Sequence, residues 1–263
     1  MTFSFLERGK GPPVLFLPGS FSTTAAWSGV WDALPDGFCL LSANLPGYAG
    51  ADDPRIASDN SMARLTDWLF GCLDQIAEPV HLVGHSFGGQ IAIAAMLQDR
   101  RNVLSLTTFE ANPVFVKPLG QSFPWLRDVQ EIAPRLAQAH ARNDADAAGI
   151  VIDYWTEAGT FAAMPERIRD FCNSGVATNL RDWDSARSFD PEISAFQDID
   201  LPATFSWGSR ASKPIADACS AIAREWPNCA TRIIQGANHF LITSHPEDCA
   251  AVIVDRIRGC EAG

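Results

Sequence analysis

The sequence predicts an α/β protein in which helices flank a mostly parallel β-sheet. In the N-terminal half, short buried apolar runs alternate with helix-like segments, and this alternation favours parallel crossover connections. The chain of 263 residues is 47% hydrophobic and 19% charged, which is sufficient for a sizeable core. A long stretch in the second half has helical patterning and no buried strand, which predicts a helical insertion between two strands.

The individual elements follow from their apolar periodicity and from the Gly and Pro residues that end them. Residues 2–7 alternate apolar and polar residues like an edge strand, and a Gly/Pro turn connects them to the buried run 14–17. These two segments predict a hairpin that feeds a central strand. Further strands are predicted at 38–42, 80–83, 104–109, 203–207 and 231–234, and helices at 27–34, 61–76, 89–97 and 246–258.

The predicted insertion divides the chain into a core of residues 1–111 and 201–263 and a helical cap of residues 112–200 over one end of the sheet. Aromatic side chains of the cap are candidates for the wall of a pocket, although each is more often part of the insertion's own core. They are Phe115, Phe123, Trp125, Trp155, Phe161, Phe171 and Trp183, from which we select Trp155 as a substrate-binding candidate.

The charge balance limits the possible partners. Twenty Lys and Arg residues stand against 31 Asp and Glu residues, and the formal net charge of −11 gives nucleic acid or an anionic membrane no favourable surface on average. Seven cysteines occur without a Cys-x-x-Cys pair, which fits neither a disulfide framework nor a structural zinc site. We recognise no signal peptide and no apolar segment of spanning length. We expect a cytoplasmic protein whose partner is a small molecule; its oligomeric state is not indicated.

A nucleophile motif occupies residues 84–88, which read Gly-His-Ser-Phe-Gly. It follows the buried run 80–83 and precedes an apolar helix, which is the strand–turn–helix context that a G-x-S-x-G nucleophile elbow requires. In such an elbow the glycines permit a tight turn, Ser86 exposes its hydroxyl above the sheet, and the N-terminus of the next helix favours a developing oxyanion. The alternative is a chance match in a loop.

With its GHSFGG sequence the chain resembles the α/β-hydrolase family along nearly its whole length. The resemblance implies an α/β-hydrolase fold with the helical cap inserted after the sixth strand, and a carboxylesterase-like serine hydrolase. It also implies an oxyanion hole formed by the backbone N–H groups of Ser20 and Phe87, with Phe21 as a substitute for Ser20. Pro18 stands where the family often has a histidine.

His239 is the expected general base. It lies in a turn after the predicted strand 231–234, at the same edge of the sheet as Ser86, and the family's base occupies a similar late Gly-x-x-His loop. His85 lies within the elbow and is expected to pack or to line the site. Together with Phe21 and Trp155, His85 forms our set of candidate substrate-binding residues.

The acid of the expected triad departs from the family's common pattern. Where many members have an aspartate after the seventh strand, this sequence has Ala211. Glu110 follows the strand next to the elbow strand, and neighbouring strands lie about 4.8 Å apart, so its carboxylate can reach the imidazole. The chain is similar in this respect to members that place their acid there. Asp217, Asp52 and Asp53 are weaker alternatives, and Glu110 could be only a solvated residue after a strand.

The set of Ser86, His239 and Glu110 suits acyl transfer through a serine acyl-enzyme, and we expect hydrolysis of a small, partly apolar ester. A lactonase, a thioesterase or a C–C bond hydrolase could use the same set. A ligand sensor that signals to a protein partner through the cap is the alternative of another class, and an interaction protein with a decayed site is a weaker one. No His, Cys or Asp cluster has metal-ligand spacing, so we expect neither a metal nor a cofactor.

Overall fold

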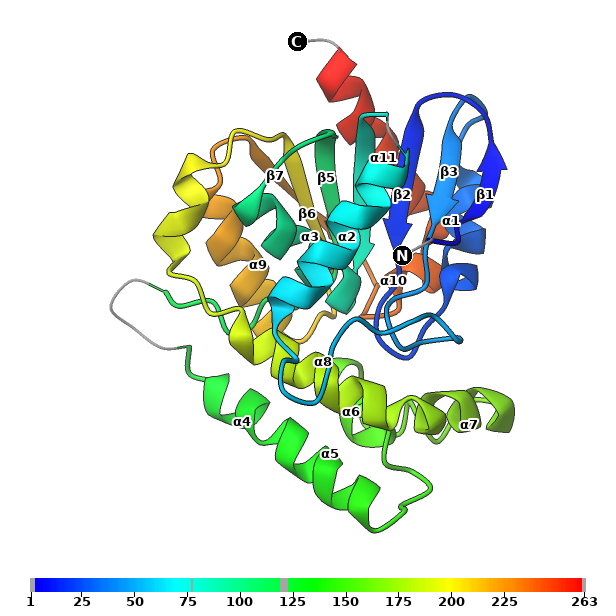
Figure 1. Ribbon diagram of the computed structural model, residues 1–263, viewed down its shortest axis with the longest axis vertical. Coiled ribbons are helices and arrows are strands. Elements are labelled where there is room, and N and C mark those ends of the chain that lie inside the picture. The colour runs from blue at the N-terminus through cyan, green and yellow to red at the C-terminus, as the bar shows by residue number, and fades with distance from the viewer. Residues whose placement is uncertain (1–2, 77, 119–122, 262–263) are drawn as a thin grey trace.

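The architecture is a seven-stranded sheet with helices on both faces, seen in the computed structural model of the chain, which describes residues 3–76, 78–118 and 123–261 (Figure 1). The strands are β1 (Leu6–Gly9), β2 (Pro13–Leu17), β3 (Cys39–Ser42), β4 (Val80–His85), β5 (Val103–Phe109), β6 (Ala203–Gly208) and β7 (Cys229–Ile234). Their order in the sheet is β1-β3-β2-β4-β5-β6-β7, and every neighbouring pair except β1 and β3 is parallel. The predicted α/β class with a mostly parallel sheet is confirmed.

The inner strands are buried on both faces because a layer of helices covers each face. One layer contains α1 (Ser28–Ala33) and α11 (Pro246–Glu261), and the other contains α2 (Met62–Ile76), α3 (Ser86–Gln98) and α9 (Lys213–Glu225). In β2, Val14 and Phe16 pack with the first layer, whereas Leu15 and Leu17 pack with the second. This two-sided burial explains why the strand is a continuous apolar run without alternation.

Helix α9 is absent from the sequence-based predictions. Four of its six buried residues have the spacing of one helix face, namely Ile215, Ala218, Cys219 and Ile222. Two of these four side chains are small, so the apolar pattern is weak in the sequence.

Within the residues that the structure describes, no helix has both the length and the apolar character to span a bilayer.

The predicted hairpin between the first two strands is wrong. β1 pairs in antiparallel orientation with β3, from Leu6 opposite Ser42 to Gly9 opposite Cys39. β3 occupies one side of β2 and β4 occupies the other, so no edge of β2 remains for β1. All four residues of β1 are exposed, which suits its position at the edge of the sheet. Thr2, where the predicted strand begins, lies outside the described residues.

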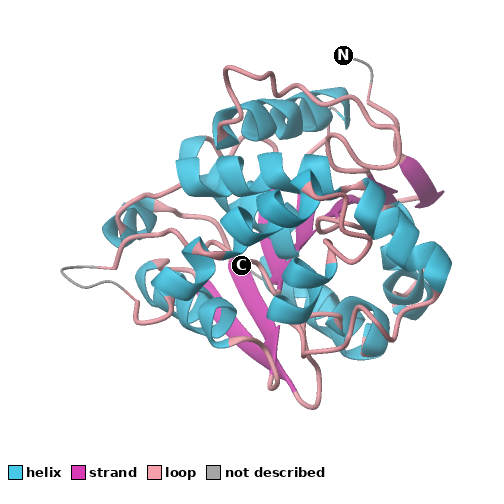
Figure 2. Cartoon of the chain, turned by 90° about the horizontal axis from the view of Figure 1, so that it is seen from below, coloured by secondary structure: helices cyan, strands magenta, loops and turns pink. Residues whose placement is uncertain are grey.

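The segment between β5 and β6 is helical where the structure describes it. Its helices are α4 (Leu126–Gln130), α5 (Ile132–Ala141), α6 (Gly149–Trp155), α7 (Glu166–Ser174), α8 (Val176–Ser188) and the 3₁₀ helix η2 (Ile193–Asp198). Helices α4 to α8 gather at one end of the sheet, below it in Figure 1, whereas η2 packs against α9 beside the sheet. Figure 2 views the molecule from the end where α4 to α8 lie. The insertion follows β5, which is the strand predicted at 104–109 and which the resemblance counts as the sixth strand of the family.

The parallel strands bring three loops to the edge of the sheet that faces the insertion. Ser86 begins α3 directly after β4, Glu110 follows β5, and His239 lies in the loop between β7 and α10 (Leu241–Ser244). A fourth loop leads from β2 into the 3₁₀ helix η1 (Thr24–Trp27). Since the carboxyl ends of parallel strands meet at one edge, residues far apart in the sequence are close together here.

Candidate active site

A sharp turn between β4 and α3 presents Ser86. Its φ of 51° lies in the left-handed region, which is strained for a residue with a side chain. A Cβ added at Gly84 would lie 2.6 Å from Gly89 Cα, and a Cβ added at Gly88 would lie 2.2 Å from Pro18 O. The close approach of backbone segments therefore requires glycine at both positions, as in a nucleophile elbow.

His239 lies beside the serine. Its Nε2 atom is 3.0 Å from Ser86 Oγ, and each of the two residues is only 6% exposed. The indole of Trp155, from α6, stacks on the imidazole with 6.1 Å between ring centres and 28° between ring planes. The insertion thus covers one face of the imidazole and restricts the access of water to it.

Glu110 completes a chain of hydrogen bonds behind the imidazole. Its Oε2 atom lies 3.2 Å from His239 Nδ1, and its Oε1 atom accepts a hydrogen bond of 2.7 Å from the Gly208 N–H. The Glu110 N–H donates to Ser206 O at 2.8 Å, so β6 holds this fully buried residue at two points. Because the carboxylate accepts a hydrogen bond from Nδ1–H, Nε2 carries no proton and is free to accept the hydroxyl proton of Ser86.

The alternative acids lie elsewhere. Asp217 accepts a hydrogen bond of 2.9 Å from Trp125 Nε1. Asp53 forms an ion pair of 2.9 Å with an arginine, and Asp52 lines a separate hollow near the N-terminal residues. Among the described residues, Glu110 is the carboxylate that the structure places at Nδ1 of the imidazole.

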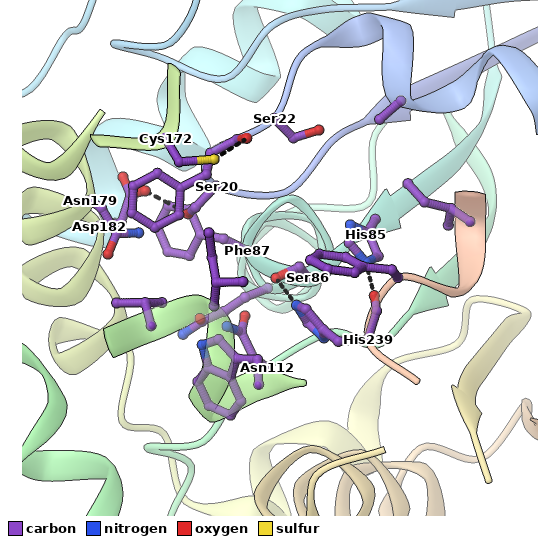
Figure 3. A pocket seen from close by; sticks show the side chains of 18 of the residues that line it. Ser20, Ser22, His85, Ser86, Phe87, Asn112, Cys172, Asn179, Asp182 and His239 are labelled. Carbon is purple, nitrogen blue, oxygen red and sulfur yellow. Dashed lines mark hydrogen bonds between the residues drawn. The ribbon is translucent and has the colours of Figure 1, made fainter. Parts of the chain in front are cut away.

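The two predicted oxyanion donors are next to the serine. The Phe87 N–H lies in the first turn of α3, directly after Ser86. Ser20 belongs to the loop after β2, which passes close to the nucleophile, because a Cβ added at Gly19 would lie 2.9 Å from Ser86 Cβ. In Figure 3, Ser20 and Phe87 lie on the side of Ser86 that is away from His239.

His85 supports the loop that carries His239. Its Nε2 atom is 2.8 Å from the carbonyl oxygen of His239. Burial, together with the neighbouring His239, lowers the pKa of His85 to about 3. The His85 ring is therefore neutral near pH 7, and its Nε2–H donates to the carbonyl oxygen of His239.

A cavity of about 290 Å³ lies beside this hydrogen-bonded chain. The three predicted substrate-binding residues, Phe21, His85 and Trp155, line it, and so does Trp183. The other aromatic candidates are not among its lining residues; they are Phe115, Phe123, Trp125, Phe161 and Phe171. Several of these pack with other side chains of the insertion instead, as the stacked pair Phe123 and Trp125 does.

Asp182 of α8 is a polar residue of the cavity wall that the sequence did not reveal. Its carboxylate accepts hydrogen bonds from Ser20 Oγ at 2.6 Å, Tyr48 Oη at 2.6 Å and Arg55 Nη1 at 2.7 Å. Burial raises the pKa of Asp182, and the guanidinium of Arg55 opposes this rise. These partners are 127 to 162 residues away in the sequence, so no local pattern indicates the contacts.

Three carboxamide side chains, those of Gln90, Asn112 and Asn179, also line the cavity. They lie on α3, after β5 and on α8, with no motif that distinguishes them from other amides of the sequence.

Within residues 3–76, 78–118 and 123–261, no group of three or more His, Cys, Asp or Glu side chains could hold a metal ion.

Two known proteins with similar sequences are hydrolases by name. The chain is 29% identical over 117 residues to the pimeloyl-[acyl-carrier protein] methyl ester esterase of Nitrosomonas europaea, a match that spans 44% of this chain and 43% of that enzyme. It is 23% identical to the 2-(acetamidomethylene)succinate hydrolase of Mesorhizobium japonicum, over 94% of this chain and 88% of the relative.

A solved structure and a family model agree with the observed fold. The crystal structure of a membrane phospholipase A superposes with a TM-score of 0.78 at 16% identity, and the match covers 98% of this chain and 83% of the other. The model of the alpha/beta hydrolase family matches residues 14–252, a range that includes the elbow and the loop of His239. The chain therefore belongs to the alpha/beta hydrolase family.

Proposed function

We propose that the protein hydrolyses an ester of a small molecule through a serine acyl-enzyme. The observation that carries this proposal is the continuous hydrogen-bonded chain from Ser86 through His239 to Glu110 at the wall of a cavity. The arrangement pairs a nucleophile with a general base and the base with an orienting carboxylate. Acyl transfer needs this combination because an unassisted serine hydroxyl is a poor nucleophile at neutral pH.

In the first half-reaction, Ser86 Oγ forms a bond to the ester carbonyl carbon while its proton moves to His239 Nε2. The carbonyl oxygen becomes an oxyanion, which the backbone N–H groups of Ser20 and Phe87 stabilise. His239 then gives the proton to the alcohol oxygen as the bond between that oxygen and the acyl carbon breaks. The alcohol leaves, and the acyl group remains on Ser86.

In the second half-reaction, water attacks the acyl carbon and gives a proton to His239. The bond between the acyl carbon and Ser86 Oγ breaks, Ser86 recovers its proton, and a carboxylic acid leaves. Glu110 keeps the imidazole in the required tautomer and stabilises the imidazolium in both halves. His85, which is neutral, holds the His239 loop by its hydrogen bond to the backbone.

The cavity and the relatives support a small, partly apolar ester as the substrate. A volume of about 290 Å³ is at the lower end of the range for ligand sites. Much of the wall is apolar, with Val151, Ile152, Trp155 and Ile168 contributed by the insertion. One relative is named as a methyl ester esterase and another as a hydrolase, which supports the hydrolysis of ester-like substrates.

Turnover of p-nitrophenyl acetate by the wild type and by Ser86→Ala tests the proposal. We expect the wild type to release p-nitrophenol and the variant to lose this activity with its fold intact. A fluorophosphonate should label the peptide that contains Ser86. Retention of activity by Ser86→Ala would contradict the nucleophile assignment, and ligand binding without any turnover would favour the sensor function. Parallel assays with lactones and thioesters separate the ester from the other acyl substrates.

A further inference from the structure

The carboxamides of Gln90, Asn112 and Asn179 line the candidate active site without serving the proposed catalytic steps. In the described part of the chain, neither Oε1 nor Nε2 of Gln90 has a hydrogen-bond partner. The Oδ1 atoms of Asn112 and Asn179 are likewise buried and without a protein partner. Buried amides are nearly always hydrogen-bonded, because an unsatisfied amide loses its interactions with water and gains none.

Gln90 has the most informative position of the three. It lies four residues after Ser86 on α3, so it occupies the same helix face about 6 Å further along the axis. Helical side chains lean toward the N-terminus of their helix, which directs the Gln90 side chain toward the end of α3 that carries the nucleophile. The residue is 0% exposed and still borders the cavity.

The two asparagines approach the cavity from other elements. Asn112 follows Glu110 after β5 and lines the same cavity as Ser86 and His239 (Figure 3). Asn179 belongs to α8 of the insertion, is 3% exposed, and lies near Asp182 in the same view. Amide groups from the core and from the insertion therefore border one cavity.

The charge of the cavity wall disfavours a charged ligand group. No Lys or Arg is among its described lining residues. The carboxylate of Asp182 already accepts hydrogen bonds from Ser20, Tyr48 and Arg55, so it is not free to bind an ammonium group. His85 is neutral near pH 7. An anion would find no fixed cation here, and a cation would find no unpaired carboxylate.

We propose that Gln90, together with Asn112 and Asn179, forms a subsite for an uncharged hydrogen-bonding group of the substrate, with an amide as the best complement. An amide of the ligand both donates and accepts, as a glutamine side chain does, so it satisfies both orphaned atoms of Gln90 at once. The substrate is then an ester that also carries a neutral amide. This inference rests on the proposed function and specifies its substrate class.

Pairs of esters that differ only in an amide test the subsite. On the acyl side, methyl N-acetylglycinate is compared with methyl pentanoate, which has the same chain length, and longer members of both series place the amide further from the ester. On the alcohol side, 2-acetamidoethyl acetate is compared with pentyl acetate. The wild type should prefer the amide member of at least one pair by about tenfold in kcat/KM.

Gln90→Leu is the decisive variant, because leucine has a similar volume and no hydrogen-bonding group. We expect it to lose the preference for the amide ester, so that its kcat/KM values for the two members of the pair become similar. Gln98→Leu is the matched control on the same helix: Gln98 accepts a hydrogen bond of 3.1 Å from Thr66 Oγ1 and is not among the lining residues of the cavity. The control should keep the wild-type preference. If Gln90→Leu does not fold, Asn179→Leu is measured in its place.

Binding to Ser86→Ala separates this inference from the proposed function. Calorimetric titration of Ser86→Ala, with and without Gln90→Leu, gives affinities for the same ester pairs without turnover. A tenfold tighter binding of the amide member, lost when Gln90→Leu is added, supports the subsite. This holds even if the wild type hydrolyses none of the esters. Absence of hydrolysis would contradict only the proposed function. Equal affinity for both members of every pair, or an unchanged preference in Gln90→Leu, would overturn the subsite.

Discussion

The hydroxyl of Ser20 donates a hydrogen bond of 2.6 Å to the buried carboxylate of Asp182. Ser20 carries one of the two candidate oxyanion N–H groups, whereas Asp182 belongs to α8 of the insertion. The contact therefore joins the oxyanion loop of the core to the helix that covers the cavity. Any displacement of α8 would also disturb the position of the Ser20 N–H relative to Ser86.

Ser20→Ala removes this contact and leaves the backbone N–H in place. We expect kcat for p-nitrophenyl acetate to fall about tenfold with little change in KM, because the oxyanion donor loses its support but the other lining residues of the cavity are unchanged. Steady-state kinetics of the purified variant measure both constants. A wild-type kcat would show that the hydroxyl does not help to hold the loop.

Asp182→Ala should destabilise the protein by about 2–4 kcal/mol, because Ser20, Tyr48 and Arg55 lose a buried hydrogen-bond acceptor, although Arg55 keeps its ion pair with Asp53. Asp184→Ala is the matched control, since Asp184 lies on the same helix but is exposed, and its loss should change the free energy of unfolding by less than about 0.5 kcal/mol. Urea denaturation measures both values. Similar effects of the two substitutions would contradict a structural role specific to Asp182.

Glu110→Gln should lower kcat by about two to four orders of magnitude while the fold is kept. The amide preserves the shape of the side chain but favours the wrong tautomer of His239 and does not stabilise its imidazolium. Asp217→Asn, on α9, should change kcat by less than about tenfold. Rate measurements with p-nitrophenyl acetate compare the two variants, and the reverse order of effects would transfer the role of the acid to Asp217.

His85 should make the folded state sensitive to mild acid. Its pKa is about 3 in the folded protein and 6.5 as a free side chain, so below pH 6.5 the unfolded chain binds a proton that the folded chain does not. The resulting loss of stability begins as the pH falls through 6.5, reaches about 2 kcal/mol at pH 5, and is absent at higher pH.

His85→Gln removes this linkage and keeps an N–H donor for the carbonyl oxygen of His239. Urea unfolding of both proteins at pH 7.5 and pH 5 should show that the wild type loses about 2 kcal/mol more than the variant between the two pH values. An equal loss in both proteins would mean that His85 is not held neutral in the folded state.

Much of the fold was predictable because its signals are local. The apolar run of β4, the glycines around Ser86 and the apolar helix α3 lie within a short segment, so the strand–turn–helix unit is visible in the sequence. The same applies to the turn that carries His239. The pairing of Glu110 with His239 was predicted from the order of parallel strands, and the structure places their side chains 3.2 Å apart.

Where prediction failed, the deciding interactions join distant segments. The pairing of β1 with β3 depended on which sheet edge remained free once β2 lay between β3 and β4, and a local alternation of apolar residues contains no such information. The polar wall of the cavity is a similar case. Gln90 and Asn179 are ordinary helix residues until α3 and α8 come to border the same cavity.

The sequence by itself determined the fold class and the candidate nucleophile, base and acid, because periodic burial and backbone turns depend on neighbouring residues. Only the tertiary structure decided which polar groups the insertion buries against the core, and with which partners. Ser20 and Asp182 are 162 residues apart, and their hydrogen bond exists because folding removes both from water at the same place. Burial creates the need for a partner, and the packing of α8 on the core determines which residue meets that need.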